Sequence, residues 1–227
     1  MKRLQKMLQM VPMDGIGFID VGTDHGTIPI SLAKQNYKGN IYASEIHADP
    51  LRKAEQYAKE AGVYGRIQFL LCDGLSLCPA DQIDCIMIAG MGGDTICRIL
   101  DQAEWIFTGQ YRIILQPTTH AEILRYWLVH NEFQIVQEEI VLEHGRVFQL
   151  FSAAIGKSAH YSDVEYYVGK LSDDRPKSSL DVLLYQEAFR LQKKVKGLSG
   201  QKNDASYQFY RTVLSEMEKL LKNGYGS

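Results

Sequence analysis

Short apolar runs rich in β-branched residues alternate with segments of helical period along roughly the first 133 residues of the chain. An apolar run of about four to eight residues bounded by turn signals is typical of a buried strand. Turn signals such as Lys38-Gly39-Asn40 and Ala61-Gly62 separate the runs from the helical segments. The alternation predicts an α/β fold in which parallel strands carry helices on both faces. The expected strands are residues 18–21, 41–44, 67–71, 83–89 and 112–115.

Two strand-like runs then break this rhythm. Residues 134–142 and 146–154 follow each other with only Glu143-His144-Gly145 between them. A short link that contains glycine predicts a β-hairpin. A doubly wound parallel sheet that ends in a reversed strand is typical of class I methyltransferases, whereas dehydrogenase domains normally lack it. The expected fold is a Rossmann-like methyltransferase sheet with a terminal hairpin.

The composition changes after Gly156, where the polar stretch Ser172-Asp173-Asp174-Arg175-Pro176 precedes two helical runs. These runs, residues 180–195 and 205–221, are separated by Gly197-Leu198-Ser199-Gly200. Their apolar residues recur at helical spacing, which predicts an antiparallel helical hairpin with an apolar seam. We expect a methyltransferase domain over residues 1–156 and a helical appendage over residues 157–227.

The 227 residues include 45% hydrophobic and 23% charged positions, which is typical of an ordinary globular protein. No apolar stretch approaches the roughly 20 residues that cross a bilayer, and the first residues lack the continuous apolar region of a signal peptide. We therefore expect no membrane span and a cytoplasmic location. The four cysteines form no C-x-x-C pair, and no histidine stands at ligand spacing from them. We expect neither a disulfide nor a bound metal.

Charge is distributed unevenly, although the formal net charge is only -2. Residues 1–156 contain 13 Lys and Arg against 18 Asp and Glu, whereas residues 157–227 contain 12 against 9. The basic excess of the tail fits either a solvated helical surface or a surface that faces phosphates, and the sequence leaves both interpretations open.

A glycine-bearing turn, Asp20-Val21-Gly22-Thr23-Asp24-His25-Gly26, lies between the first strand and a helix, where α/β proteins bind nucleotide-like ligands. Asp24 stands where the motif G-x-G-x-x-G has a glycine that admits a pyrophosphate. Two like charges about 4 Å apart at an effective dielectric constant of about 20 repel by about 4 kcal/mol, which disfavours NAD. S-adenosylmethionine has no phosphate, and its sulfonium and ammonium groups would attract a carboxylate.

Further candidates follow the next strands. Glu45 ends the second strand and is placed to accept hydrogen bonds from both ribose hydroxyls, and Asp73 follows the third strand and is placed to accept from the adenine amino group. Glycines around Met91 end the fourth strand, where Met91 would line the site beside the transferred methyl group. The candidate cofactor-binding residues are Asp20, Gly22, Thr23, Asp24, Gly26, Glu45, Ile46, Cys72, Asp73, Gly74, Gly90 and Met91.

These motifs resemble those of the bacterial tRNA (adenine-22-N1)-methyltransferase family. The resemblance spans most of the chain and is carried by the turn from Asp20 to Gly26, by Ile88-Ala89-Gly90-Met91-Gly92-Gly93 and by Leu115-Gln116-Pro117. The basic N-terminal helix with Arg3-Leu4 is similar too. The resemblance implies S-adenosylmethionine as cofactor, N1 of adenine 22 in tRNA as methyl acceptor, and an appendage that helps to hold tRNA.

The sequence departs from the family pattern at two positions. Thr27 stands before Ile28-Pro29, where the family often has an aromatic residue, and Thr118 follows Gln116-Pro117, where many members have Asn. Both changes bear on contacts with the target base rather than on the cofactor site.

Methyl transfer to adenine N1 depends on alignment more than on a base, because N1 carries a lone pair that is mostly unprotonated at neutral pH. The methylated ring becomes cationic, so a nearby carboxylate would stabilise the developing charge. Asp24 is our candidate catalytic residue for this role, and it is also placed to accept from the adenine amino group. His25 is a second catalytic candidate, and the alternative for His25 is a loop histidine that fixes the turn through backbone hydrogen bonds.

The target adenine must be unpaired or turned out of its stack before N1 is accessible, which implies a surface that recognises tRNA. Phosphate contacts from basic residues at the two ends of the chain would grip tRNA without reading its sequence. We expect a monomer whose partners are tRNA and S-adenosylmethionine, without a metal or a membrane. The candidate RNA-binding residues are Lys2, Arg3, Lys6, Lys193, Lys194 and Lys196.

Two other functions fit the same motifs. The first is an S-adenosylmethionine-dependent methyltransferase that acts on a protein or a small molecule, in which case methyl incorporation would not require tRNA. The second is a regulatory protein that binds a nucleotide-like ligand on a Rossmann-like fold and turns nothing over.

Overall fold

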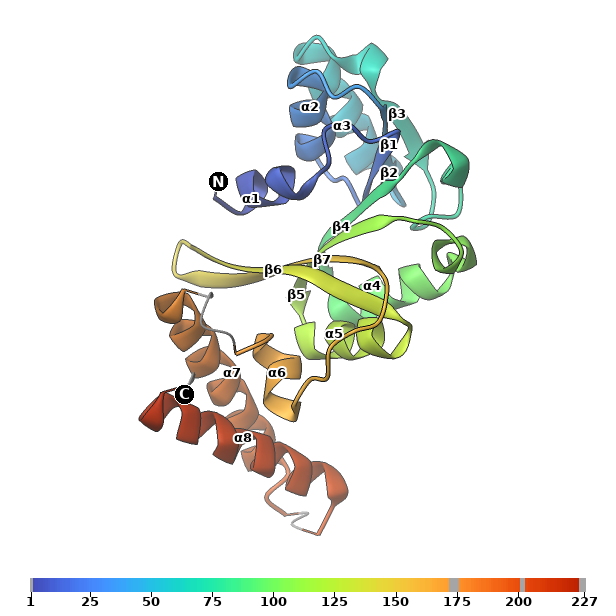
Figure 1. Cartoon of the computed structure of the whole chain (residues 1–227). Coiled ribbons are helices and arrows are strands. Elements are labelled where there is room, and N and C mark those ends of the chain that lie inside the picture. Colours follow the sequence, from blue (N-terminus) through green and yellow to red (C-terminus); the bar gives the residue numbers. More distant parts are fainter. Residues whose placement is uncertain (1, 172–175, 201–202, 225–227) are drawn as a thin grey trace.

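The centre of the computed structural model is a seven-stranded sheet in the order β3-β2-β1-β4-β5-β7-β6 (Figure 1). The structure describes residues 2–171, 176–200 and 203–224, so the polar residues Ser172 to Arg175 lie outside the described part. Strands β1 to β5 run parallel, and β7 and β6 follow as antiparallel neighbours. The expected Rossmann-like sheet with a terminal hairpin is confirmed. The strands are β1 (Gly17–Val21), β2 (Asn40–Glu45), β3 (Gln68–Leu71), β4 (Cys85–Gly92), β5 (Arg112–Thr119), β6 (Phe133–Glu143) and β7 (Arg146–Ile155).

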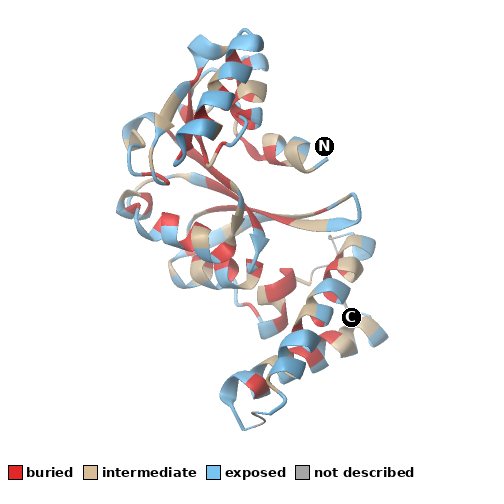
Figure 2. Cartoon of the chain, turned by 180° about the vertical axis from the view of Figure 1, so that it is seen from behind, coloured by how far each residue is buried: buried red, intermediate tan, exposed pale blue. Residues whose placement is uncertain are grey.

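Helices cover both faces of the sheet, as the alternating pattern predicts. The apolar sides of α1 (Lys2–Met10), α2 (Thr27–Lys34) and α3 (Ala48–Glu60) pack on one face. Those of α4 (Gly93–Asp101) and α5 (Ala121–His130) pack on the other. Buried positions therefore follow the strands and the inner sides of these helices (Figure 2). Short 3-10 helices span Tyr64–Arg66, Ala80–Gln82 and Glu104–Phe107.

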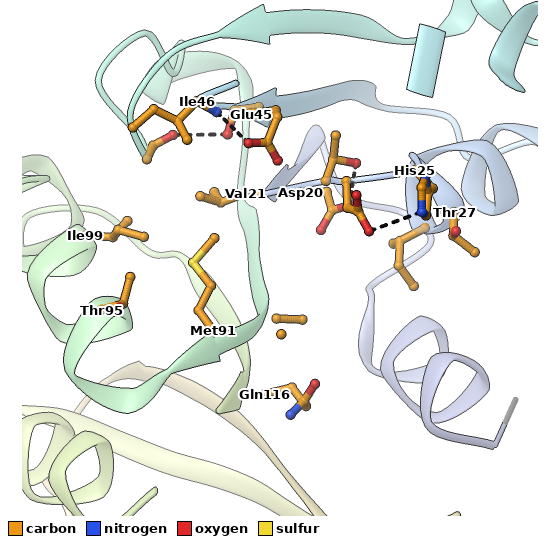
Figure 3. Close-up of a pocket in the computed structure, with 18 of the residues that line it drawn as sticks. Asp20, Val21, His25, Thr27, Glu45, Ile46, Met91, Thr95, Ile99 and Gln116 are labelled. Atoms are coloured by element: carbon orange, nitrogen blue, oxygen red, sulfur yellow. Dashed lines mark hydrogen bonds and ion pairs between the residues drawn. The ribbon is translucent and has the colours of Figure 1, made fainter. Parts of the chain in front are cut away.

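Two strands extend further than the sequence predicts. β4 continues to Gly92 and β5 to Thr119, because the two strands resume pairing after a register shift beside Gly90. An extra residue in one strand bends the strand and changes the direction in which the next side chain points. Gly90 has a φ of 79°, which glycine adopts without steric cost. Met91 consequently points toward the carboxyl edge of the sheet, into the cavity described below (Figure 3).

The hairpin turn is one residue shorter than predicted. Glu143 pairs with Arg146, so Glu143 belongs to β6 and only His144 and Gly145 form the turn. Their φ values of 50° and 72° are both positive. A two-residue turn with two positive φ values matches the right-handed twist of a hairpin, and glycine at the second position adopts this conformation readily.

The distal half of the hairpin lies between α1 and the C-terminal helices (Figure 1). Ile140 and Val147 pack against the C-terminal helices, whereas the next residues, Val141 and Phe148, pack on the side of α1. Successive side chains of a strand point to opposite faces, so one apolar hairpin serves two layers. The hairpin thereby connects the N-terminal helix to the C-terminal helices.

Three helices follow the hairpin, one more than the sequence predicts. They are α6 (Asp163–Val168), α7 (Lys177–Gly197) and α8 (Ala205–Asn223). The helix α6 was missed, although Ser162 and Glu165 form a capping box that is readable as S-x-x-E. The long helices α7 and α8 share a third apolar cluster, as the seam predicted. The division into domains at residue 156 stays a prediction.

No helix within the described ranges is long and apolar enough to cross a bilayer.

Arg125 of α5 is a buried charged residue, and none of its side chain is exposed. Its Nε donates to Glu138 Oε1 at 2.8 Å, Nη2 donates to Gln149 Oε1 at 2.7 Å, and Nη1 donates to the carbonyl of Tyr166. The guanidinium carbon lies 4.4 Å from the centre of the Phe151 ring. One side chain therefore joins α5 to β6, β7 and α6.

We expect Arg125→Met to lower the free energy of unfolding by about 3–5 kcal/mol, because the carboxylate of Glu138 stays buried while the arginine that neutralises it is lost. Urea unfolding followed by circular dichroism measures the change. The control Arg211→Met, at an exposed position of α8, should change it by less than about 0.5 kcal/mol. An equally small change for both variants would show that this network does not stabilise the fold.

Candidate active site

A cavity of about 590 Å³ opens at the carboxyl edge of the parallel strands (Figure 3). It lies where β1 and β4 run side by side. The chain after β1 passes into α2 on one face, and the chain after β4 passes into α4 on the other. The connecting loops diverge at this point, and ligands of doubly wound sheets bind in the resulting crevice.

Most of the predicted cofactor residues line this one cavity. Gly26 does not line the cavity. It is the N-cap residue of α2 and has a φ of 67°. The catalytic candidate His25 also lines the cavity. The lining residues that the sequence predicted as cofactor-binding are Asp20, Gly22, Thr23, Asp24, Glu45, Ile46, Cys72, Asp73, Gly74, Gly90 and Met91.

The turn after β1 is fixed by backbone geometry. Gly22 has a φ of 71°, and a Cβ added there would lie 2.1 Å from Met91 Cε. The amides of Gly22 and Thr23 both donate to the carbonyl of Ser44, at 2.8 and 3.0 Å. A side chain at Gly22 would displace the end of the Met91 side chain, and the positive φ favours glycine whatever the space.

Asp20 carries a buried carboxyl group at the floor of the turn, with 5% of the residue exposed. The hydroxyl of Thr23 donates to Asp20 Oδ2 at 2.7 Å. Burial and, to a lesser extent, the nearby charge of Glu45 raise the pKa of Asp20 to about 7, against the opposing effect of the Thr23 hydrogen bond. Asp20 therefore changes its charge close to neutral pH.

Glu45 is held in one orientation at the end of β2. Its Oε1 accepts from the backbone amides of Ile46 at 2.9 Å and His47 at 3.1 Å. These amides begin the turn into α3, and a carboxylate near a helix N-terminus is stabilised by the helix dipole.

Asp24 and His25 lie at the mouth of the cavity rather than in its interior. Their side chains are 68% and 52% exposed, and Asp24 Oδ2 lies 3.5 Å from His25 Nε2. The His25 ring meets the edge of the Tyr57 ring at 5.8 Å between centroids. Asp24 has a φ of 50°, unusual for a residue other than glycine. Both side chains are therefore accessible to a second molecule that enters from solvent.

The far end of the cavity is formed after β3. The amide of Cys72 donates to the carbonyl of Glu45 at 3.0 Å, and the Ser44 hydroxyl donates to the carbonyl of Gly74 at 3.0 Å. Gly74 has a φ of 55° and packs close to Ile99 of α4. These contacts fix the backbone on either side of Asp73, whose side chain is exposed at the cavity edge.

Several lining residues were not predicted as part of a cofactor site. Arg3 was expected to bind phosphates, but the structure places it in the cavity wall, where its Nη1 donates to Gln116 Oε1 at 3.3 Å. Gln116 is fully buried. The family motif around Gln116 marks that residue in the sequence, whereas nothing in the sequence marks Arg3 as its partner. The other lining residues that were not predicted as cofactor-binding are Leu4, Met7, Val21, Thr27, Ile28, Ser44, Ala89, Thr95, Arg98 and Ile99.

The structure does not bring the head and tail lysines together. Lys6 pairs with Glu139 at 3.3 Å, and the backbone amide of Lys2 donates to Glu143 at 2.7 Å. These residues lie by the hairpin, whereas Lys193, Lys194 and Lys196 lie near the other end of α7 (Figure 1).

The charge of Lys194, one of the tail lysines, affects Asp94 near the carboxyl edge of the sheet. His120 follows β5 and hydrogen-bonds to Asp94 at the start of α4, which lowers the pKa of Asp94, and the charge of Lys194 adds to this effect. The Lys194 ammonium lies 4.3 Å from the Tyr210 ring centre, and that of Lys193 lies 4.4 Å from the Phe189 ring centre. Two of the three tail lysines, Lys193 and Lys194, therefore lie over aromatic faces.

No cluster of three metal-ligating side chains occurs among the residues that the structure describes.

Comparison with known proteins assigns this architecture to one family of enzymes. A family model described as a methyltransferase domain matches residues 1–151. The Bacillus subtilis tRNA (adenine(22)-N(1))-methyltransferase is 32% identical over 171 residues, which are 75% of this chain and 71% of that protein.

Solved structures match over nearly the whole chain. A Streptococcus agalactiae protein of the NADB-Rossmann superfamily is 28% identical with a TM-score of 0.84, and the match covers 97% of this chain and 96% of that one. The M. capricolum protein TrmK, in complex with S-adenosyl-homocysteine, is 26% identical with a TM-score of 0.79, and the match again covers 97% and 96%.

The pKa of Asp20 makes stability depend on pH in a defined direction. An unfolded aspartate loses its proton near pH 4, whereas folded Asp20 keeps it to about pH 7. The folded state binds more protons between these values, so stability falls as the pH rises from about 4 to about 7. Asparagine cannot ionise at this position. We therefore expect the melting temperature of Asp20→Asn to fall less than that of the wild type between about pH 5 and pH 8.

Thermal unfolding of the ligand-free protein at several pH values measures this difference. The control Asp14→Asn, at an exposed position, should parallel the wild type. Parallel curves for Asp20→Asn as well would mean that Asp20 ionises normally in the fold.

Proposed function

Because this chain belongs to the tRNA (adenine(22)-N(1))-methyltransferase family, within the methyltransferase-domain proteins, we propose that it transfers the methyl group of S-adenosylmethionine to N1 of adenine 22 in tRNA. The relatives supply the reaction and the substrate. The residues that would carry it are assigned below from the contacts in the cavity.

One observation supports the cofactor most directly: four carboxyl groups line the cavity, from Asp20, Asp24, Glu45 and Asp73, and they outnumber its two arginines, Arg3 and Arg98. Such a wall repels a pyrophosphate and attracts a cationic ligand. S-adenosylmethionine carries a sulfonium and an ammonium group and has hydroxyl and amino donors along its length. The charge of the cavity and the donors of the cofactor therefore match.

In this proposal the ribose and the adenine of the cofactor each have their own acceptor. Glu45, with Oε1 held by two amides, accepts from the ribose hydroxyls through Oε2. Asp73 accepts from the adenine amino group at the end of β3. Thr23 and Gly22 form the wall beside Asp20, and Ile46, Cys72, Gly74 and Gly90 shape the rest of the wall, while Gly26 directs α2 away from it.

S-adenosylmethionine, when bound, supplies an electrophilic methyl group. The protein then has to orient adenine N1 toward that group and exclude water, and Met91 packs against Gly22 as an apolar part of the cavity wall. Asp24 stabilises the positive charge that develops on the ring, with His25 beside it. Both are accessible at the mouth, where a base turned out of tRNA would enter.

We assign the grip on tRNA to the basic residues outside the cavity. Lys194 acts on Asp94 at the edge of the sheet between β4 and β5, which supports a path for RNA from α7 to the cavity mouth. Lys193, Lys196, Lys2 and Lys6 would add phosphate contacts on the same sequence-independent basis. Thr27 lines the cavity and leaves more room there than an aromatic residue would.

We propose a cytoplasmic monomer in which residues 1–156 form the catalytic domain and residues 157–227 the tRNA-binding appendage.

The decisive assay incubates the protein with methyl-labelled S-adenosylmethionine and an unmodified tRNA transcript, followed by nucleoside analysis. We expect 1-methyladenosine with adenine at position 22 and none when that base is guanine. Label that enters a protein or a small molecule without tRNA would favour the other methyltransferase class. Cofactor binding without any transfer would favour the regulatory protein.

The role of Asp24 makes a separate prediction. Asp24→Asn keeps the shape of the side chain and one acceptor but loses the charge, so we expect cofactor affinity within about tenfold of the wild type and a turnover about 10²-fold lower. Single-turnover methylation and cofactor binding across pH measure the two effects. Rate recovery at high pH would indicate a general base instead, and a loss of affinity equal to the loss of rate would make Asp24 a cofactor ligand.

A further inference from the structure

A second cavity, of about 330 Å³, lies where α6, α7 and α8 meet α5, and we call it the aromatic pocket. Pockets for small molecules usually measure about 300–1,000 Å³, so this one has room for a single planar ring system rather than for a whole cofactor. Five of the nine lining residues that the structure describes carry aromatic rings. These are Tyr126, Tyr166, Tyr167, Phe209 and Tyr210. The wall is therefore suited to a flat ligand that stacks on it.

Two of these rings are open to solvent. Tyr126 on α5 is 54% exposed, and Phe209 on α8 is 43% exposed. The His130 ring stacks on Tyr126 at 3.7 Å between centroids, and the Tyr166 ring lies 5.5 Å from Tyr126, so neighbouring rings fix its orientation. A group of exposed apolar side chains on one surface often marks a binding site. The pocket thus offers a stacking surface on each of two helices.

Lys194 adds a positive charge to the wall of the aromatic pocket. Its Nζ lies 4.3 Å from the centre of the Tyr210 ring and donates to the Tyr210 hydroxyl at 3.2 Å. A lysine ammonium has three donors and this side chain is exposed, so donors remain for an anion. A cation beside exposed rings is a combination that binds nucleotides, because bases stack on the rings while a phosphate pairs with the cation.

Two carboxyl groups in the wall narrow the choice of occupant. Glu122 Oε2 forms an ion pair with Arg190 Nη2 at 2.8 Å, and Asp163 is exposed in the first turn of α6. Carboxylates accept hydrogen bonds from the amino groups of bases and repel an acidic peptide. An apolar partner, such as a face of a second copy, would cover Lys194 and Asp163 without pairing them. The charges therefore favour a base that carries an amino group.

The aromatic pocket lies beside the edge of the sheet on which the active-site cavity opens. Glu122 stands in the first turn of α5, and only one residue separates α5 from the carboxyl end of β5. The pKa of Asp94, at the start of α4 on the same edge, is lowered by its hydrogen bond to His120 and also by the charge of Lys194. An RNA that places a base at the cavity mouth can therefore continue into the aromatic pocket.

We propose that the aromatic pocket binds one unpaired nucleotide of tRNA, distinct from the target adenine. Its base stacks on Tyr126 and Phe209, and an adjacent phosphate pairs with Lys194. The inference rests on the proposed function, from which it takes RNA as the ligand class. Phosphate contacts alone carry no information about the bases, whereas a stacking pocket admits only a base that has left its helix. The pocket thus selects a folded tRNA with an exposed nucleotide over duplex RNA.

The test measures the Kd of an unmodified tRNA transcript for the full chain at several salt concentrations. We expect Tyr126→Ala and Phe209→Ala each to weaken binding by about 5- to 100-fold, the usual effect of losing one stack between a base and an aromatic ring. The slope of log Kd against log salt should stay unchanged, because stacking releases no counterions. Lys194→Met should instead reduce that slope by about 0.7, the value for one phosphate of a single strand.

Matched variants separate the ring from the rest of the side chain. Tyr126→Phe keeps the ring and should stay within about twofold of the wild type. Tyr185→Ala removes a 63% exposed ring from α7 outside the pocket and should leave the Kd unchanged. A blunt RNA duplex should bind the wild type and the ring variants equally. Thermal unfolding reports whether each variant is folded.

Unchanged tRNA affinity in Tyr126→Ala and Phe209→Ala would overturn the proposal. An equal loss of duplex binding would do so too, because a duplex offers no unpaired base to stack. A wild-type dimer that Phe209→Ala converts to a monomer, as measured by sedimentation, would show that a second copy covers the pocket instead. If the ring variants lost tRNA affinity as expected while the wild type formed no 1-methyladenosine, the pocket would stand and the proposed function would fail.

Discussion

The site depends on one constraint in the sheet: β1 and β4 are parallel neighbours whose following helices go to opposite faces. Two connections that leave the same edge in opposite directions cannot fill the space between them. The cavity follows from this topology. The glycines at positions 22 and 90 then let the backbone turn at the rim, and Met91 occupies the space that a side chain at position 22 would need.

Four carboxyl groups line the cavity, and their surroundings differ from residue to residue. Two backbone amides at the start of α3 donate to the carboxylate of Glu45, and Asp24 and Asp73 are exposed to solvent. Asp20 is neither solvated nor paired with a cation, so its pKa rises to about 7. A cationic ligand would reverse this shift, since an opposite charge favours the ionised carboxylate. Ligand binding and proton release are therefore coupled in this cavity.

The hairpin β6–β7 connects the cavity to the C-terminal helices. Its alternating side chains reach α1 on one face and α7 on the other, and Arg125 ties its base to α5 and α6. The helix that carries Arg3 and the helix that carries the tail lysines therefore pack on the same two strands. Packed side chains of the hairpin therefore connect the C-terminal helices to the helix that forms part of the cavity wall.

The sequence by itself determined the sheet, the hairpin and the turn after β1, because hydrophobic periodicity and local glycine chemistry act between near neighbours in the chain. The same local reasoning predicted twelve cofactor-binding residues, and eleven of them line one cavity, because the carboxyl ends of parallel strands meet at one edge. The roles of these residues stay predictions. Only the tertiary structure decided that β4 resumes pairing beyond Gly90, that Arg3 faces Gln116 instead of solvent, and that the head and tail lysines lie apart. Each of these results depends on contacts between distant segments, and the periodicity of a single segment contains no information about which distant side chain will meet it.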